Sequence, residues 1–518
     1  MTDTAARRLH RPGVSAPGPV DGIRLARRVG LTGSLLMAGS ALGSGALPVP
    51  NPLSGIRLLG LPARNTTLAI ALTYVGMGLL IVAWVWVARA LRSEAGRFGT
   101  DPFVPAPGRG LLARTALLWA APLAVAPPLF SRDVYSYLAQ GEVLLRGLDP
   151  YLTGPAAALG VDDPLVRNVP AMWRGTPAPY GPLSLVLGRG VADFAGDDAV
   201  LGIMAHRLLA LVGIAAMVWA LPRLAARCGA DGNRALWLGA AHPMVLFHLV
   251  SGVHNDGLMI GLFLAGLEVG LRGSARLLDP RFLGGAVLIV AASAVKLPAL
   301  LVLGFLGMEQ ARRRGGRVRD VTVVAAVLGV VAPAVYVALG PLTTDGWGWL
   351  HTVSVPSLSI EWMSLTTDLG LASGQLGLLV GLGDHTDEIL NLTRGAGLTA
   401  AALGCVWLLL ATLRGRFDAV TAMAAAMGVV VLFGPSVQPW YLLWAVVPLA
   451  ATTAMPRYRT GMLGGTAVIA LLILPTGAAF DFHTYQLLMS IGAALVILVA
   501  ALWLLRRYLT QLASRPSG

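Results

Sequence analysis

The chain has 518 residues, of which 56% are hydrophobic and only 13% are charged, and its mean hydropathy is +0.71. Soluble proteins carry about 25% charged residues, so this composition excludes a soluble globular protein and indicates a membrane protein. The net charge of +13 does not indicate nucleic-acid binding, because the arginines cluster in short loops beside apolar blocks. The two cysteines, Cys228 and Cys405, show no CxxC or metal-ligand spacing.

Apolar blocks about 20 residues long, enough to cross ~30 Å of hydrocarbon, recur along the chain. Residues 1–28 are rich in Arg, Pro and Gly and are predicted to form a disordered cytoplasmic arm. Residues 29–506 are predicted to form one transmembrane domain, and residues 507–518 a cytoplasmic tail. We predict an all-α polytopic protein with about 12 full spans, at residues 29–47, 68–90, 111–130, 199–221, 235–251, 256–272, 320–340, 396–413, 417–433, 440–455, 460–476 and 486–506.

The distribution of arginine predicts how these spans are oriented. Arginines crowd the N-terminal arm and then every second loop, so both termini are expected on the cytoplasmic side. The loop of residues 309–320 is the most basic short loop and is also expected inside. Two long loops, at residues 131–198 and 341–395, then face outward, where they are predicted to form short amphipathic helices along the membrane surface.

Residues 282–308 hold Lys296, the only lysine of the chain, in the middle of an apolar run. Because basic loops flank this segment on both sides, it must return to the side it left, and it is too short for two crossings. A re-entrant helical hairpin fits, with arms of about 18 Å and a turn at Lys296 and Pro298. A lysine at such a tip is costly unless it faces a watery cavity or an anion. The alternatives are a snorkelling lysine and a single long kinked span.

The string "SRDVYSYLAQGEVLLRGLDPY" follows the third predicted span and opens an interfacial helix. Its Asp133 stands at the mouth of that helix. A carboxylate at the end of a span, facing a cavity, can accept a proton from an alcohol as a general base. Position alone favours the alternative that Asp133 caps the helix, since Asp is a preferred N-cap residue.

Other short motifs place polar and aromatic groups in the outer turns. "GVHND" sets His254, Asn255 and Asp256 between two spans, either as helix caps or as part of a metal site for which no further ligands have recognisable spacing. "TPAPYGPLSLVLG" predicts a rigid surface loop leading into a membrane-dipping helix. The aromatic residues of "FGPSVQPWYLLW" suit either a membrane-interface belt or stacking against a sugar.

The motifs "SRDVYSYLAQGEVLLRGLDPY", "APYGP", "GVHND" and "AVKLPALL", in this order, resemble the actinobacterial polyprenol-phosphomannose-dependent α-(1→6) mannosyltransferases of lipomannan and lipoarabinomannan synthesis. These are integral-membrane enzymes of the GT-C superfamily, and the resemblance covers about residues 29–506. It implies transfer of mannose, with inversion, from a polyprenyl-phosphate carrier to the 6-hydroxyl of an α-mannan acceptor. It also implies an active site on the extracytoplasmic side of the plasma membrane. Neither the initiating nor the elongating branch of the family is favoured.

The resemblance also implies roles for particular residues. The catalytic acid of GT-C enzymes stands in an early outer loop at the end of a span, which matches Asp133 as the base. Lys296 and Arg132 are the cations expected against the donor phosphate. No metal or other cofactor is predicted, although the His254–Asp256 cluster leaves a divalent metal open. The residues expected to contact substrate are Tyr135, Tyr137, Gln140, Tyr180, His254, Asn255, Asp256, Glu361, Gln438 and Trp440.

A transporter or flippase for a polyprenyl-linked sugar is the alternative function, because it too would use about a dozen spans and a buried cation. Transporters of this size usually show two similar halves with a site at the midplane. Here the halves differ and both long loops lie on one face, which favours an interfacial enzyme. The predicted partners are therefore the polyprenyl-phosphate-mannose donor, an α-mannan lipoglycan acceptor and membrane lipid, with no nucleic acid.

Overall fold

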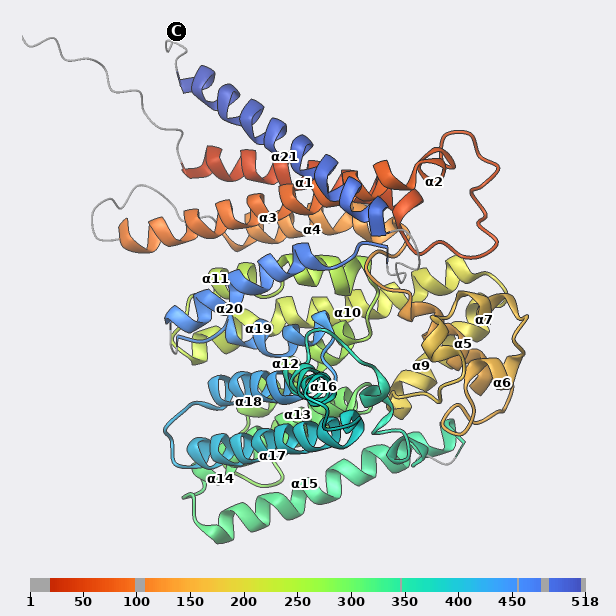
Figure 1. Cartoon of the computed structure of the whole chain (residues 1–518). Coiled ribbons are helices and arrows are strands. Elements are labelled where there is room, and N and C mark those ends of the chain that lie inside the picture. Colours follow the sequence, from red (N-terminus) through yellow and green to blue (C-terminus); the bar gives the residue numbers. More distant parts are fainter. Residues whose placement is uncertain (1–18, 98–107, 345–346, 454–455, 477–483, 514–518) are drawn as a thin grey trace, which may run out of the picture.

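Apolar helices of very different lengths build the molecule, and no strand occurs in the described part of the chain (Figure 1). The structure is a computed structural model that describes residues 19–97, 108–344, 347–453, 456–476 and 484–513. Among these residues, four helices are long and apolar enough to cross a membrane. They are α3 (Thr66–Arg97), α10 (Ala199–Arg227), α15 (Val318–Leu339) and α17 (Thr386–Leu413).

A fifth span results if a bent pair of helices is counted as one. The π-helix η1 (Val245–Ser251) and α12 (Asp256–Leu271) meet at 110°. Residues 235–251, predicted as one span, are instead broken between α11 (Gly232–Leu238) and η1. Gly239 ends α11, and Pro243 lacks the N–H that a continuous helix would need. The apolar helices support a membrane protein, but the predicted number of 12 spans is not confirmed.

The remaining predicted spans coincide with helices that are shorter or are joined to irregular turns. Residues 19–28, predicted to be disordered, form the first turns of α1, while residues 1–18 lie outside the described part of the chain. The last helix likewise runs into the predicted tail. These elements are α1 (Pro19–Ser44), α4 (Arg109–Val125), α18 (Ala419–Phe433), η6 (Pro439–Leu442), α19 (Leu443–Leu449), α20 (Pro456–Ile469), η7 (Ala470–Leu472) and α21 (Thr484–Ala513), while α2 (Leu61–Arg64) lies between the first two predicted spans.

The segment around Lys296 forms a helical hairpin. Its arms, α13 (Pro280–Ser293) and α14 (Leu300–Arg313), have 14 residues each, or about 21 Å, and are joined through the 3-10 turn η2 (Leu297–Ala299). The far ends of the arms meet, because the Gln310 side chain of α14 donates to the carbonyl of Ser274, just before α13. The chain thus returns to the end it left, which excludes one long kinked helix.

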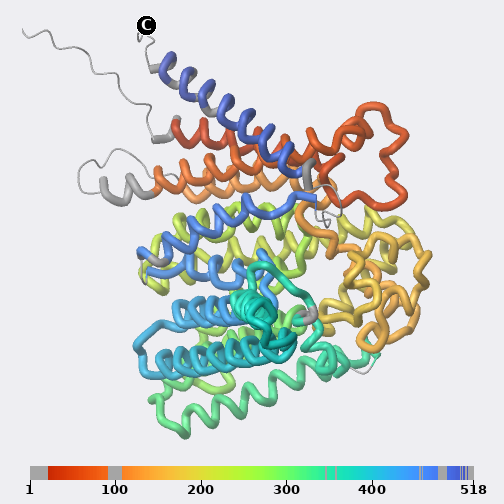
Figure 2. The backbone as a smooth tube through the Cα atoms, in the orientation of Figure 1, coloured from red at the N-terminus to blue at the C-terminus, as the bar shows by residue number. Residues whose placement is uncertain are grey.

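The first long loop folds into short helices that cover one end of the bundle, at the right of Figures 1 and 2. The longest helix of the second long loop packs against α17 and lies nearer the middle of Figure 1. In the first loop, every helix after the first one begins directly after a proline, glycine or aspartate that interrupts the preceding turn. Its helices are α5 (Asp133–Leu145), α6 (Pro155–Leu159), α7 (Pro164–Asn168), α8 (Ala171–Arg174) and α9 (Pro182–Ala195). The second loop contains η3 (Gly340–Leu342), η4 (Gly348–Leu350), η5 (Val355–Leu358) and α16 (Leu365–Leu379).

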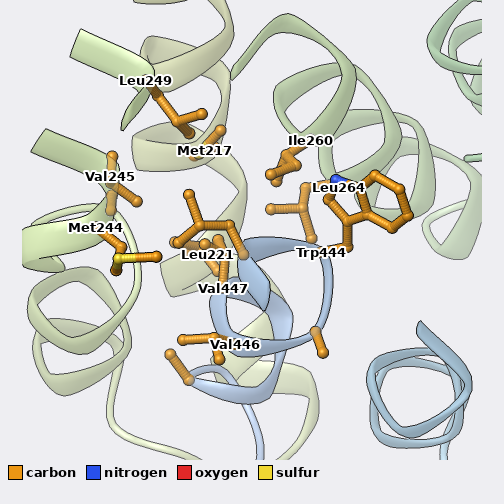
Figure 3. Close-up of a cluster of buried hydrophobic side chains, with 14 of the residues drawn as sticks. Met217, Leu221, Met244, Val245, Leu249, Ile260, Leu264, Trp444, Val446 and Val447 are labelled. Atoms are coloured by element: carbon orange, nitrogen blue, oxygen red, sulfur yellow. The ribbon is translucent and has the colours of Figure 1, made fainter. Parts of the chain in front are cut away.

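The core lies where α10, α12, η1 and α19 meet. Figure 3 shows Met217 of α10, Leu264 of α12 and Val447 of α19 in this cluster, and all three are fully buried. The close approach of α10 and α12 requires glycine, since a Cβ on Gly213 or Gly261 would lie 2.1 Å from a backbone oxygen of the facing helix. This packing fixes the start of α12, where the cavity described below lies.

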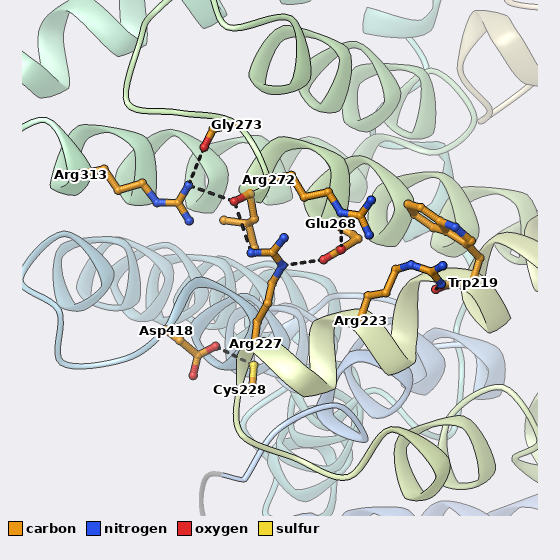
Figure 4. Close-up of polar contacts among 10 residues, drawn as sticks. Trp219, Arg223, Arg227, Cys228, Glu268, Arg272, Gly273, Arg313 and Asp418 are labelled. Atoms are coloured by element: carbon orange, nitrogen blue, oxygen red, sulfur yellow. Dashed lines mark hydrogen bonds and ion pairs between the residues drawn. The ribbon is translucent and has the colours of Figure 1, made fainter. Parts of the chain in front are cut away.

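Arginine side chains gather at the other end of the bundle (Figure 4). Arg227 and Arg272 donate to the buried carboxylate of Glu268, at 2.6 and 2.8 Å. Arg313 donates to the free carbonyl oxygens of Leu271, at the end of α12, and of the neighbouring Gly273. Positive side chains at a helix C-terminus stabilise its unpaired carbonyls, so these contacts explain how the basic loops are held.

Candidate active site

A cavity of about 1580 Å³ opens at the end of the bundle that the short helices cover. Segments far apart in the sequence line it, and the four motifs singled out above all meet at or directly behind its wall. The main lining segments are residues 130–133, 179–181, 293–304, 349–362, 391–405 and 434–444.

Asp133 lies in the wall of this cavity as the first residue of α5. The helix is not capped by a side chain: its N-cap residue is Arg132, and the Asp133 backbone N–H donates to Ser131 Oγ at 3.0 Å. In the described structure the Asp133 carboxylate accepts no hydrogen bond from the helix backbone. The geometry therefore does not support the capping role that position alone favoured, and the carboxylate stays available to the cavity.

Burial raises the pKa of the Asp133 carboxyl to about 6, although the Lys296 ammonium lowers it and the Asp256 carboxylate raises it further. Asp133 Oδ2 lies 3.6 Å from His254 Nδ1, and the His254 ring stacks on Trp440 with 3.7 Å between ring centroids. A carboxyl group with a pKa near 6 is mostly ionised at pH 7, yet it is a stronger base than an ordinary aspartate.

Lys296 lies at the tip of the hairpin and also lines the cavity. Its ammonium is 3.0 and 3.2 Å from the two carboxylate oxygens of Asp256, which is fully buried. Trp444 Nε1 donates to the same carboxylate at 2.6 Å, and the Tyr441 ring lies 4.4 Å below the ammonium. Asp256, predicted to contact substrate, is thus the ion partner whose charge offsets the cost of burying the Lys296 ammonium.

The "APYGP" motif holds the hairpin tip in place. The backbone N–H of Gly181 donates to the carbonyl of Val295, and that of Leu183 donates to Ala294, at 3.2 and 2.9 Å. A Cβ at Gly181 would lie 2.4 Å from the Ala294 carbonyl oxygen. Only glycine allows this approach, so Gly181 sets the position of the residue that follows Val295, which is Lys296.

The backbone next to the site is strained at two positions. Phe130 and Val253 have left-handed φ angles of 70° and 59° without being glycine. Such a φ is a genuine outlier for a β-branched residue like Val253. These residues immediately precede the segments that carry Asp133 and His254, and strain of this kind concentrates at functional sites.

Arg132, the second predicted phosphate ligand, lines the cavity but is partly committed to the protein. Its guanidinium donates to the backbone and side-chain oxygens of Asn168, at 3.2 and 3.1 Å, and lies over the Tyr135 ring. These partners are uncharged, and no acidic residue in the described chain forms an ion pair with Arg132. Its positive charge therefore remains uncompensated.

Glu361, Gln438, Trp440 and Tyr180, predicted as substrate contacts, all line the cavity. Glu361 accepts a hydrogen bond from Gln438 Nε2 at 2.6 Å and another from the Ser359 hydroxyl. This contact joins the second long loop to the turn before α19, so both of these segments bound the same space.

The other six predicted contacts stand behind the cavity wall. Tyr135 donates to the carbonyl of Ala46 at 2.7 Å, and Tyr137 packs edge-on against Tyr180. Asn255 lies 3.4 Å from Ser184 Oγ, the length of a weak hydrogen bond. Contact of these residues with substrate stays a prediction. The six are Tyr135, Tyr137, Gln140, His254, Asn255 and Asp256.

The sequence left open whether the site binds a divalent metal. The described residues contain no group of three or more His, Cys, Asp or Glu side chains that could hold a metal ion. The predicted absence of a cofactor itself stays a prediction.

The sequence analysis also missed Arg394 of α17, which lines the cavity. An arginine at the outer end of a predicted span breaks the positive-inside pattern, and that signal could have found it.

Known proteins are similar to most of the chain. Residues 27–312 match the family model of the alpha-(1->6)-mannopyranosyltransferase N-terminal domain, and residues 366–503 match that of the MptB C-terminal domain. A probable alpha-(1->6)-mannopyranosyltransferase of Mycolicibacterium smegmatis is 42% identical, over 93% of this chain and 88% of that protein. An alpha-(1->6)-mannopyranosyltransferase of Mycobacterium tuberculosis is 39% identical, over 91% and 86%. Alpha-(1->6)-mannopyranosyltransferase B of Corynebacterium glutamicum is 37% identical, over 93% and 82%.

These matches confirm the resemblance carried by the four motifs, and they extend over both the first and the second half of the helical bundle. The chain belongs to the alpha-(1->6)-mannopyranosyltransferase family.

Proposed function

We propose that this chain transfers mannose from a polyprenyl-phosphate carrier to the 6-hydroxyl of an α-mannan acceptor, with inversion at C1. The names of the relatives support α-(1→6) mannosyl transfer and do not favour a transporter or flippase. One observation carries the proposal: the Asp133 carboxylate and the Lys296 ammonium line one cavity whose remaining wall includes apolar helix faces. Such a cavity suits a substrate that is part sugar and part lipid.

The chemistry requires one base and one stabilised leaving group. The acceptor 6-hydroxyl attacks C1 of the donor mannose, its proton passes to the Asp133 carboxylate, and the bond from C1 to the phosphate oxygen breaks. Because a single in-line displacement inverts C1, a β-linked donor gives the α-linked product. The electron pair leaves with polyprenyl phosphate, whose developing charge Lys296 and Arg132 would stabilise.

The acceptor is proposed to enter from the side of the second long loop. Glu361 and Gln438 lie in the wall there, and both can exchange hydrogen bonds with sugar hydroxyls. Trp440 offers an aromatic face in the same region of the cavity.

The outer face of the plasma membrane is the proposed side of reaction. The cavity lies at one end of the bundle and the arginine cluster of Figure 4 lies at the other. Since basic loops stay on the cytoplasmic side, this polarity supports an extracytoplasmic site. Thr153 is exposed at the cavity end and Arg414 at the basic end. After Cys228 and Cys405 are replaced, Thr153→Cys should react with a membrane-impermeant thiol reagent in intact cells, and Arg414→Cys only in inverted vesicles; the reverse pattern would overturn the orientation.

Transfer is tested with purified protein in lipid, polyprenyl-phosphomannose and an α-(1→6)-linked mannoside. The expected product is extended by one mannose, whose anomeric configuration and linkage are assigned by nuclear magnetic resonance. A β-linked product, or mannose transfer from a nucleotide sugar alone, would contradict the proposal.

A further inference from the structure

The cavity contains three cations, and they differ in how much of their charge is already used. Lys296 is paired with Asp256, and Arg132 donates to Asn168 through Nε and Nη2. Arg394 donates through Nε to Thr367 Oγ1 and through Nη1 to the carbonyl of Ser357, both at 3.0 Å. Both of these partners are neutral.

The third nitrogen of Arg394 has no hydrogen-bond partner. Nη2 is buried and unpaired, and within the described residues no acidic side chain forms an ion pair with Arg394. A buried guanidinium nitrogen without a partner costs free energy that an anionic ligand would recover. Two of its nitrogens are held by the protein, so the guanidinium is fixed in orientation before a ligand arrives.

The helix face below Arg394 is apolar. Leu398, Ala401 and Cys405 follow at helical spacing and line the same cavity, so one face of α17 carries a cation at its top and an apolar strip that ends about 16 Å below it. Facing it, Leu297 of the hairpin turn and Leu301 and Gly304 of the second arm line the cavity as well. The two helices are in contact, and the small residues Gly304 and Ala401 both line the cavity between them.

We infer that Arg394 binds the phosphate of the lipid carrier and that the strip between α14 and α17 holds the first part of its isoprenoid chain. The inference rests on the proposed function, and it adds Arg394 to Lys296 and Arg132, the cations that the sequence analysis placed against the donor phosphate. A phosphate joined to a long hydrocarbon matches a fixed, unpaired cation at the head of an apolar strip, whereas a polar mannan does not. Lys296 is then left to act near Asp133, where the glycosidic bond breaks.

The first test measures binding, without transfer. Polyprenyl phosphate and the uncharged polyprenol of the same length are titrated into the purified full chain in lipid nanodiscs. The wild-type protein should prefer the phosphate, and Arg394→Gln should lose about 10-fold to 100-fold of affinity for it while keeping its affinity for the alcohol. Arg394→Lys should recover part of the preference. Equal loss of both ligands would assign Arg394 a purely structural role and overturn the inference.

Two control variants separate charge from packing. Thr367→Val removes the Nε contact but leaves the charge, so it should keep most of the preference for phosphate. Arg167→Gln removes an exposed arginine of the first long loop that does not line the cavity, and it should change nothing. Loss of the preference in either control would contradict the inference.

The strip is tested separately through Ala402, which is exposed on the same face of α17. Ala402→Phe should weaken the binding of a long-chain polyprenyl phosphate about 10-fold and the binding of a two-isoprene analogue much less. An equal loss of affinity for both lipids would contradict the binding of the isoprenoid chain to this strip.

Transfer kinetics distinguish failure of this inference from failure of the proposed function. If wild-type protein transfers mannose and Arg394→Gln raises the donor KM without changing the acceptor KM, both stand. If transfer is normal and the donor KM does not change, only the inference fails. If no lipid-linked donor supports transfer, the proposed function fails, while the binding titrations still decide the role of Arg394.

Discussion

Helix α12 carries one buried carboxylate near each end, and the two ends of the bundle use them differently. Glu268, in the last turn, accepts from two arginines that do not line the candidate active-site cavity (Figure 4). Asp256, in the first turn, pairs with Lys296, whose side chain reaches the cavity. Both carboxylates are almost fully buried, so burial alone does not tell a structural charge from a functional one.

The difference lies in what surrounds each pair. Around Glu268, the arginine side chains form hydrogen bonds with its carboxylate and with nearby carbonyl oxygens. Around Asp256, both ring nitrogens of His248 and of His254 lack hydrogen bonds, Gln140 Oε1 lacks a partner, and the backbone at Val253 is strained. Natural proteins leave polar groups unsatisfied mainly where a ligand will later satisfy them. Buried polar atoms without hydrogen-bond partners are thus more numerous around the cavity, although Arg314 Nε at the basic end also lacks a partner.

The largest expected effect comes from Asp133→Asn, which removes the proposed base and leaves the shape of the side chain. Transfer should fall by about 10²–10⁴-fold, the usual contribution of general base catalysis. The rate is measured with saturating donor and acceptor. The control is Glu142→Gln on the same helix, where an exposed ion pair with Arg146 is lost and activity should stay within twofold. If the transfer rate of Asp133→Asn stays above a tenth of the wild-type rate, Asp133 is not the base.

Gly181→Ala tests whether the first long loop positions the hairpin tip. The new Cβ would press on the Ala294 carbonyl and displace Lys296, and displacements near 1 Å cost up to about 100-fold in rate. A loss of about 10-fold to 100-fold in kcat is expected. Gly190→Ala in α9 is the matched control, because nothing lies within 4 Å of its Cβ position. If both variants behave alike, the contact between Gly181 and the tip has no role in catalysis.

The pH dependence of transfer should follow the Asp133 carboxyl. Burial raises its pKa to about 6, and the base acts only in its ionised form. The logarithm of kcat/KM should therefore rise with pH up to about 6 and then level off, so the rate at pH 5 is about a tenth of the plateau. A profile that is flat between pH 5 and 7, or falls as pH rises, would contradict this assignment.

The functional end could be found in the sequence because its charges stand in unusual places. Lys296 interrupts an apolar run and Asp133 sits at the end of one, and few arrangements make such residues affordable. Their partners could not be found in this way. The pairing of Lys296 with Asp256 depends on how α12 and α13 pack, and the position of Arg394 in the cavity wall depends on how α17 packs against α14.

Span number was the weakest prediction, and the reason is physical. A hydropathy window measures composition over about 20 residues and does not detect a broken backbone. Residues 235–251 are apolar enough to span, but Gly239 and Pro243 divide them into two short pieces. The two pieces, α11 and η1, have seven residues each, which is too few to cross the hydrocarbon alone.

The two carboxylates of α12 give the finest test of the difference between the ends. Glu268→Gln keeps the shape but weakens contacts with two arginines whose side chains are 33% and 41% exposed, so it should cost about 1–3 kcal/mol of stability. The thermal unfolding midpoint in lipid should fall, while transfer per folded molecule stays within twofold. Asp256→Asn should lower the midpoint too. It should also reduce the transfer rate about 10-fold or more, because Lys296 loses the carboxylate that orients its side chain. Equal losses of activity in both variants would mean that α12 transmits any disturbance to the cavity, and satisfaction of polar groups would then no longer distinguish the two ends.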